Sequence, residues 1–217
     1  METFVVRVWL PDRPGALGQV ASAIGSIGGD VAGIEILERG GGSAIDELTV
    51  SLPSAALLDA LIEAMRGVSG VAVEDVRPVD PDRPDGALAG LTAVAAIAAT
   101  PVDLRLETAC DLLRDLFDAD WVVAVALDGG AALASAGEQP SLDWLGAFLL
   151  GSEHLDAQQS PGDLVWVRAP QFGVAIASGR SGRVFHARER DEFRIIGSII
   201  DSLAPSLAGA ATLPRPW

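Results

Sequence analysis

The sequence predicts an α+β protein of two domains. Apolar residues switch repeatedly between the two-residue spacing of strands and the three- and four-residue spacing of helices. The 217 residues suffice for two ordinary domains that bury their cores without disulfides or metals. Three prolines and three aspartates in PVDPDRPDG, residues 78–86, interrupt otherwise apolar sequence and indicate a stiff, solvated linker. We therefore place the domain boundary in this linker.

Before the linker, strand and helix patterns follow one another in a definite order. The predicted elements are a strand at 4–10, a helix at 17–27, strands at 31–38 and 48–52, a helix that begins after Pro53-Ser54 and closes near Gly67, and a strand at 71–76. Gly28-Gly29 ends the first helix, and Gly40-Gly41-Gly42 supplies a hairpin. With two right-handed crossovers, this order gives a four-stranded antiparallel sheet with both helices on one face, the ferredoxin-like βαββαβ arrangement.

After the linker, the pattern predicts a second α+β domain with a central antiparallel sheet. The predicted elements are a helix from about Pro101, a strand at 120–127, a hairpin at Asp128-Gly129 into a strand at 131–136, a helix at 142–150, strands at 164–169 and 173–178, and a helix from about Asp191 to Leu207. We expect the first domain at residues 1–79, the linker and an alanine-rich helix at 80–100, and the second domain at 101–217.

The amino-acid composition excludes several classes of chemistry. Every basic residue is an arginine and tyrosine is absent, so the chain has no lysine for a Schiff base or a phosphate-binding loop and no phenol nucleophile. The formal net charge of -15 repels nucleic acid and anionic lipid, so we expect neither as a direct partner. The amino terminus lacks the pattern of a secretory signal, and a lone cysteine fits a reducing compartment, so a cytoplasmic protein is expected. No cofactor or metal site is predicted.

The segment between the first strand and the first helix carries the most informative motif. In Asp12-Arg13-Pro14-Gly15-Ala16-Leu17, Pro14 suits the start of a helix and Gly15 lets another group approach the backbone. Exposed amides at the positive end of the helix dipole would then suit a carboxylate. Capping of those amides by Asp12 itself explains the segment equally well.

This motif, with I-G-G-D-V at 27–31 and the element order through about Val79, resembles the ACT domain, a regulatory module that binds amino acids. The resemblance implies a ligand site between the first loop and the second strand, usually across the interface of a homodimer. The residues that it implies are Asp12, Arg13, Pro14, Gly15, Ala16 and Leu17, facing Gly29, Asp30 and Val31. Asp30, where many relatives have asparagine, is the expected partner for a ligand ammonium.

The second half resembles a GAF domain, a small-molecule sensor fold, in D-W-V-V-A-V-A-L at 120–127 and in G-R-V-F-H-A-R-E-R-D-E-F-R-I-I at 182–196. The chain lacks the asparagine and lysine of the cyclic-nucleotide branch and the cysteines of the redox branch. Neither of those two activities is therefore expected.

Other polar residues have simpler interpretations. Cys110 shares an apolar stripe with Leu113 and Phe117, which favours a buried small hydrophobe. Glu153, His154 and Asp156 are interpreted as a solvated loop. Arginines and carboxylates around His186 are interpreted as a surface network. We expect tryptophans in cores or interfaces.

Two functions follow from these sequence features. The leading one is a non-enzymatic regulatory sensor whose ACT-like domain binds an amino acid. The alternative is a structural or interaction protein whose ACT-like and GAF-like domains mediate dimerisation without a ligand. Dimer contacts are expected at the edge strand 31–38 or the sheet face with Trp9, and at Ile199 and Leu203 of the last helix, with Ile196 and Ile200 in the core.

Overall fold

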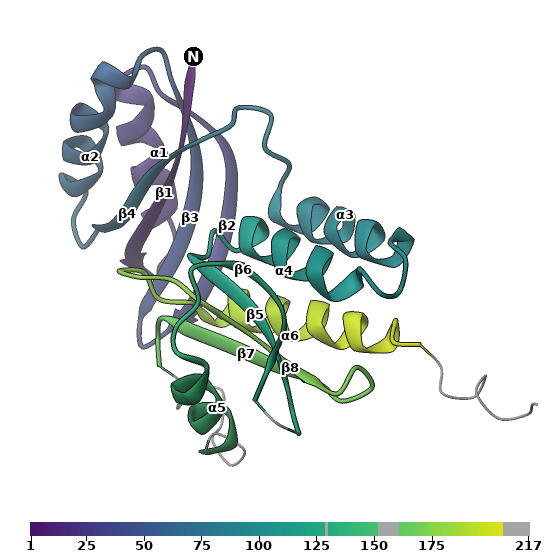
Figure 1. The fold of residues 1–217 in the computed structure, drawn as a ribbon. Coiled ribbons are helices and arrows are strands. Elements are labelled where there is room, and N and C mark those ends of the chain that lie inside the picture. Colours follow the sequence, from purple (N-terminus) through teal and green to yellow (C-terminus); the bar gives the residue numbers. More distant parts are fainter. Residues whose placement is uncertain (129, 152–160, 206–217) are drawn as a thin grey trace, which may run out of the picture. The chain divides into compact units, whose positions relative to one another are not determined.

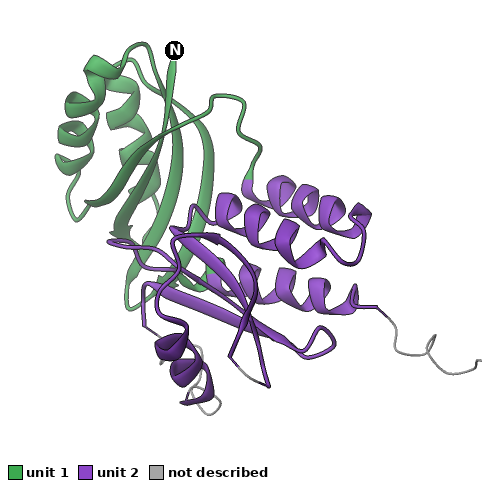
Figure 2. Cartoon of the chain, viewed as in Figure 1, with its two compact units in different colours: residues 1–85, 186–189 green, residues 86–185, 190–217 purple. Residues whose placement is uncertain are grey.

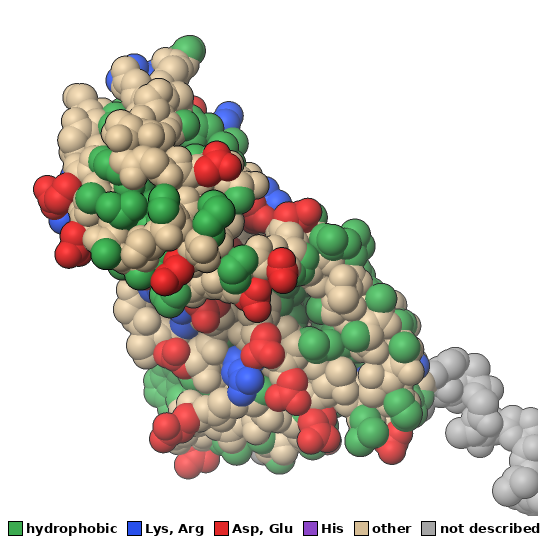
Figure 3. All heavy atoms as spheres, turned by 90° about the horizontal axis from the view of Figure 1, so that it is seen from above, with side chains coloured by type: hydrophobic (Ala, Val, Ile, Leu, Met, Phe, Trp, Pro, Cys, Tyr) green, Lys and Arg blue, Asp and Glu red, His purple; other side chains and the backbone are tan. Residues whose placement is uncertain are grey.

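The computed structural model describes residues 1–128, 130–151 and 161–205, and it divides the chain into two compact units. The first unit comprises residues 1–85 together with 186–189, and the second comprises 86–185 and 190–217 (Figure 2). Helix α3, which we expected in the connection between the domains, falls within the second unit. Acidic side chains are spread over the face shown in Figure 3, in keeping with the net charge of -15.

The elements of the first unit follow the predicted order (Figure 1). They are β1 (Glu2–Pro11), α1 (Ala16–Ser26), β2 (Asp30–Gly40), β3 (Ser43–Leu52), the short 3-10 helix η1 (Ala55–Leu57), α2 (Leu58–Arg66) and β4 (Ala72–Val79). All three strand pairs are antiparallel, and the order across the sheet is β2-β3-β1-β4. The α+β, ferredoxin-like fold is therefore confirmed, and β2 is an edge strand as predicted.

One face of this sheet forms the apolar core with both helices. Val6 and Val8 of β1 pack with Ile24 of α1 and with Leu61 and Met65 of α2, and all five side chains are buried. The apolar stripes of α1 and α2 face the sheet, and their burial there stabilises both helices.

Helix α1 ends where the double glycine predicts. The amide of Gly28 donates to Gly25 O at 3.0 Å and that of Gly29 to Ile24 O at 3.1 Å, the paired bonds of a Schellman motif. Gly28 adopts a φ of 79°, which disfavours any residue with a side chain. A Cβ at Gly29 would lie 2.9 Å from Ile24 Cγ2, so this glycine is needed for packing.

The opposite face of the sheet carries a buried ion pair. Arg7 lies directly across from Glu47 on β3 and is 1% exposed. Its Nη2 lies 2.7 Å from Glu47 Oε2 and 3.1 Å from Glu189 Oε1. Burial opposes the charge of Arg7, but the carboxylates of Glu189 and Glu47 outweigh it and raise the pKa of the guanidinium.

The same face differs from our expectation at Trp9. Trp9 is 42% exposed, its indole N–H donates to Glu74, and its ring meets the imidazole of His186 edge-on at 6.3 Å between centroids. Residues 186–189 of the chain thus occupy part of this face, and the dimer contact expected through the rest of it stays a prediction. The edge of β2 also remains an expected contact of the first unit.

The second unit is built on a four-stranded antiparallel sheet of order β6-β5-β8-β7, so the predicted central antiparallel sheet is confirmed. Its elements are α3 (Gly86–Ala99), α4 (Arg105–Leu116), β5 (Trp121–Ala126), β6 (Ala132–Gly137), α5 (Leu142–Gly151), β7 (Leu164–Ala169), β8 (Val174–Gly179) and α6 (Ala187–Ser202).

Both faces of this second sheet are covered. On one face, α4 and the later turns of α6 pack their apolar residues, and Ile97 of α3 joins the same core. On the other face, Leu145 and Leu149 of α5 pack on Val123 and Val125 of β5. The sheet is therefore the middle of three layers.

The cysteine and the last helix test two further expectations. Cys110 is buried as predicted, and burial raises the pKa of its thiol to about 12, which leaves it unreactive. In α6, Ile196 and Ile200 are buried and Ile199 is 37% exposed, as expected. Leu203 is partly buried against the unit's own core, and its role at an interface stays a prediction. Leu207 lies outside the described residues.

We predict that Arg7→Met lowers the free energy of unfolding by about 3–5 kcal/mol, because it leaves the partly buried carboxylates of Glu47 and Glu189 without their shared cation. Urea denaturation of the full chain measures this loss. Arg66→Met is the control: Arg66 is 57% exposed in its pair with Glu63, and its loss is expected to cost at most about 1 kcal/mol. Similar losses in the two variants would contradict the role assigned to Arg7.

Candidate ligand site at the start of helix α1

The turn between β1 and α1 leaves backbone amides without side-chain caps. Gly15 is the N-cap residue of α1, with a φ of 85° and no side chain to accept from the first turn. The amide of Ala16 donates to Arg13 O at 3.2 Å. Within the described residues, the amides of Leu17 and Gly18 have no capping side chain, so they are donors at the positive end of the helix dipole.

Asp12 does not cap this helix. Its side chain is exposed and accepts no hydrogen bond from the described part of the chain, whereas its backbone amide donates to Gly42 O at 3.0 Å. This bond ties the loop to the hairpin between β2 and β3. Arg13 donates to Gln19 Oε1 at 3.2 Å and Pro14 is exposed, so neither closes over the amides. The capping interpretation of the motif is therefore wrong.

A buried carboxylate lies on the helix-facing side of the sheet near this loop. Asp46 of β3 is 3% exposed, and its Oδ1 has no hydrogen-bond partner among the described residues. It pairs with Val8 in the β1–β3 register, and Val8 belongs to the apolar core under the helices. Buried polar atoms are almost always paired, so this oxygen is a candidate for a ligand contact.

The electrostatics of Asp46 connect it to the loop. Burial raises its pKa above the ordinary value of 3.8, the cation of Arg39 opposes this shift, and the carboxylate of Asp12 adds to it. Two carboxylates and one arginine thus act on each other at the end of the sheet where α1 begins. An ammonium group placed there would meet an excess of negative charge.

Asp46 is not among the site residues predicted from the sequence, although the sequence contains its signal. Residues 44, 48, 50 and 52 of β3 are apolar and alternate as one buried face, and residue 46 has the same phase. A charged residue at a core position of a strand requires a partner or a function. That mismatch is the sequence signal that could have pointed to Asp46.

The remaining predicted site residues lie elsewhere within one chain. Asp30 pairs with Ser51 at one end of the sheet, whereas Pro11 pairs with Ser43 at the other. Gly29, Asp30 and Val31 follow α1, whose 11 residues span about 16 Å and separate them from the loop at 12–17. A single chain does not bring the two halves of the predicted site together.

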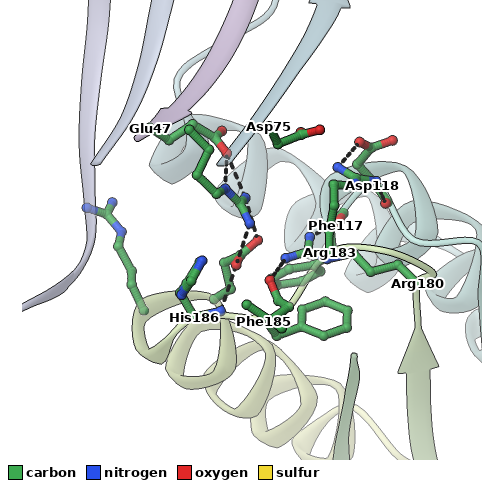
Figure 4. A network of polar contacts seen from close by, with 12 residues as sticks. Glu47, Asp75, Phe117, Asp118, Arg180, Arg183, Phe185 and His186 are labelled. Atoms are coloured by element: carbon green, nitrogen blue, oxygen red, sulfur yellow. Dashed lines mark hydrogen bonds and ion pairs between the residues drawn. The ribbon is translucent and has the colours of Figure 1, made fainter. Parts of the chain in front are cut away.

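The interpretation of the charges around His186 as a surface network is wrong, because His186 is 3% and Arg180 3% exposed. In the first unit, His186 Nε2 lies 3.0 Å from Glu74 Oε1. The backbone amide of His186 donates to Glu189 Oε2 at 2.8 Å (Figure 4). Burial raises the pKa of Glu74, but its contact with His186 more than offsets this and holds it below the ordinary value.

In the second unit, Arg180 donates to the carbonyl oxygens of Phe117 at 2.8 Å and Val184 at 2.6 Å (Figure 4). Its guanidinium also lies 4.0 Å from the ring centroid of Phe185. Buried neighbours of this kind give Arg180 a structural role. The sequence gives no local signal for the bond to Phe117, because Phe117 and Arg180 are 63 positions apart along the chain.

Neither a metal centre nor a membrane span is found in the part of the chain that the structure describes. No cluster of three or more histidine, cysteine, aspartate or glutamate side chains there could hold a metal ion. No described helix is long and apolar enough to cross a bilayer. The predicted loop with Glu153, His154 and Asp156 lies outside the described residues.

Comparison with known proteins returns similar solved structures but no matching family model and no matching curated protein. The ACT domain from GTP pyrophosphokinase of Chlorobium tepidum is 19% identical, with a TM-score of 0.30, over 36% of this chain and 100% of that one. The regulatory subunit of aspartate kinase from Thermus thermophilus is 20% identical, with a TM-score of 0.32, over 46% and 72%.

A protein of Galdieria sulphuraria is 19% identical, with a TM-score of 0.30, over 60% of this chain and 75% of that one. Because these TM-scores lie below 0.5, the fold assignment rests on the strand order and register of the chain itself.

We predict that Asp46→Asn gains stability relative to the wild type as the pH rises from about 4 to about 7. Because folding raises the pKa of Asp46, the folded state binds its proton more tightly than the unfolded state, and wild-type stability falls as pH rises from 3.8 through the raised pKa. Urea denaturation across this pH range measures the difference. Asp82→Asn, at an exposed linker position, controls for loss of one negative charge. Parallel pH profiles of stability for Asp46→Asn and the wild type would show that folding does not raise the pKa of Asp46.

Proposed function

We propose that the protein is a non-enzymatic, cytoplasmic regulatory sensor that binds an amino acid at the start of α1. The proposal is carried by two groups of opposite polarity at one end of the sheet, a set of backbone N–H donors and a buried carboxylate. The uncapped amides of Leu17 and Gly18 suit an α-carboxylate, and the unpartnered oxygen of buried Asp46 suits an α-ammonium.

The energetics favour such a ligand. A buried carboxylate without a partner is costly, and an ammonium that hydrogen-bonds to it removes that cost. The side-chain-free turn at Gly15 leaves the amides accessible, since an added Cβ there would meet nothing within 4 Å. The loop residues Asp12, Arg13, Pro14, Gly15, Ala16 and Leu17 therefore form our proposed site, with Asp46 as its floor.

A homodimer would bring in the other predicted residues. Edge strand β2 has bulges between Val31 and Gly33 and between Ile36 and Glu38, which leaves 33–36 as its regular stretch. Antiparallel pairing of two copies about the middle of this stretch would set Asp30 of the partner subunit opposite Arg39. Arg39 is at the end of β2 that the hairpin joins to the Asp12 loop. Gly29, Asp30 and Val31 would thereby complete the site across the interface.

The proposed mechanism is a population shift. A ligand that touches the loop of one copy and β2 of the other favours the dimer geometry in which both are in place. We propose that the second, GAF-like unit transmits this change or senses a second signal.

The alternative function is ligand-free assembly, and exposed apolar side chains of the second unit favour it. Leu88 and Leu91 of α3 are 54% and 69% exposed, and Ile195 of α6 is 56% exposed. Figure 3 shows hydrophobic side chains gathered over α3. Surfaces of this kind serve protein association.

We predict that at least one proteinogenic amino acid raises the melting temperature of the full chain, since a ligand of the folded state must stabilise it. Calorimetric titration with that amino acid should give a Kd at least about tenfold weaker for Asp46→Asn, equivalent to about 1.4 kcal/mol. Asp82→Asn should bind as the wild type does. A panel without any stabilising amino acid, or equal affinity in Asp46→Asn, would refute the proposed site.

We also predict that Ile34→Lys, which adds a charge to the 46% exposed edge position of β2, shifts the full chain from dimer to monomer. Light scattering coupled to size exclusion measures the mass of each variant. Ile195→Lys on α6 is the comparison and should leave the mass unchanged. The reverse result, with only Ile195→Lys monomeric, would contradict the β2 interface and favour the alternative function.

A further inference from the structure

A cleft in the second unit lies on the α5 side of the sheet, in the other unit from the proposed amino-acid site. Its volume is about 470 Å³. This is within the range of about 300–1,000 Å³ that is usual for small-molecule sites. The lining residues are Val125, Ala126, Leu127, Asp128, Gly130, Leu142, Asp143, Gly146, Leu149, Leu150, Arg168 and Ala175.

Small residues create this space. Val125 and Ala175 are neighbours in the β5–β8 ladder and line the cleft as buried residues of the sheet, whereas Leu127 and Leu150 line it with side chains that are 38% and 67% exposed. Above the sheet residues, α5 contributes Gly146, and a Cβ built at this glycine meets no heavy atom within 4 Å. Leu149 of α5 closes one side of the cleft. The cleft is therefore open where a side chain on α5 would fill it.

The rim carries more negative than positive charge. Asp128 follows β5 and Asp143 lies in the first turn of α5, and both are exposed. Arg168 of β7 is the single basic residue among the described lining residues. The chain as a whole has a formal charge of -15, which concentrates cations near its surface.

We propose that this cleft binds a small molecule with an apolar body and a protonated amine. The body packs on the exposed apolar side chains of Leu127 and Leu150, and the amine meets the carboxylates of Asp128 and Asp143. This site is separate from the proposed amino-acid site, since it contains neither Asp46 nor the loop at 12–17. The protein would then have one ligand site in each unit.

A matched set of probes tests the chemistry of the cleft. 2-Phenylethylamine, 2-phenylethanol and 3-phenylpropionate share an aromatic body and differ in the charge of the head group. Ligand-observed NMR titration of the full chain should give a Kd for the amine at least about tenfold lower than for the alcohol or the acid. Equal binding of the three probes, preference for the acid, or no binding of the amine at millimolar concentration would overturn the proposal.

Two variants locate the binding. Gly146→Leu fills the cleft and should weaken amine binding at least about tenfold, and it should fold because leucine has the higher helix propensity. Gly25→Leu in α1 is the control, since a Cβ there also meets nothing within 4 Å, and it should bind as the wild type does. Asp143→Asn should weaken binding of the amine but not of the alcohol. Unchanged amine affinity in Gly146→Leu, with a melting temperature at or above that of the wild type, would place the binding elsewhere.

Asp46→Asn separates this proposal from the proposed function. Amine binding to the cleft should be unaffected by this variant, whereas amino-acid binding at α1 should be weakened. Loss of amine binding in Asp46→Asn would mean that the amine occupies the α1 site, and it would overturn the second site while leaving the first intact.

Discussion

The charge on Arg7 is the constraint on which the first unit depends. Arg7 is on a central strand and is 1% exposed, so its cation must be neutralised inside the protein. Glu47 and Glu189 supply that charge, and the second of them holds residues 186–189 to the sheet. Because α1 and α2 cover the other face, both faces of the sheet are engaged. Features of this unit that remain available for recognition include the edge strands β2 and β4 and the loop before α1.

Neighbouring acids on β3 show how the two faces differ. Asp46 and Glu47 are consecutive, so they point to opposite sides of the sheet. Burial opposes ionisation of both, but Arg77 and Arg7 offset it at Glu47, whose pKa is lowered, whereas the pKa of Asp46 is raised. One acid has its partners within the fold and is structural. The other retains an unsatisfied oxygen, and such a perturbed group beside an accessible loop is a reasonable candidate for ligand recognition.

The architecture could be predicted from the sequence because helix ends and buried strand faces are specified by residues that are close together in the chain. Gly15 and Gly28 mark the start and end of α1, and the alternation of apolar residues in β1 and β3 specifies which face is buried. The site was less predictable for two reasons. Asp46 is a single polar residue in an apolar phase, and His186 gains its partner Glu74 only through contacts over 112 positions of sequence. Such long-range pairing is invisible to local patterns, as is the separation of Asp30 from the α1 loop.

The most direct test of the proposed amino-acid site is the amide NMR spectrum of the full chain during titration with the amino acid that stabilises it most. If the α-carboxylate binds the first turn of α1, the amide protons of Leu17 and Gly18 should move downfield, and the side-chain carboxyl carbon of Asp46 should shift with them. Saturation at the same ligand concentration for all three signals would support one site. Shifts confined to residues outside the loop and β3 would contradict it.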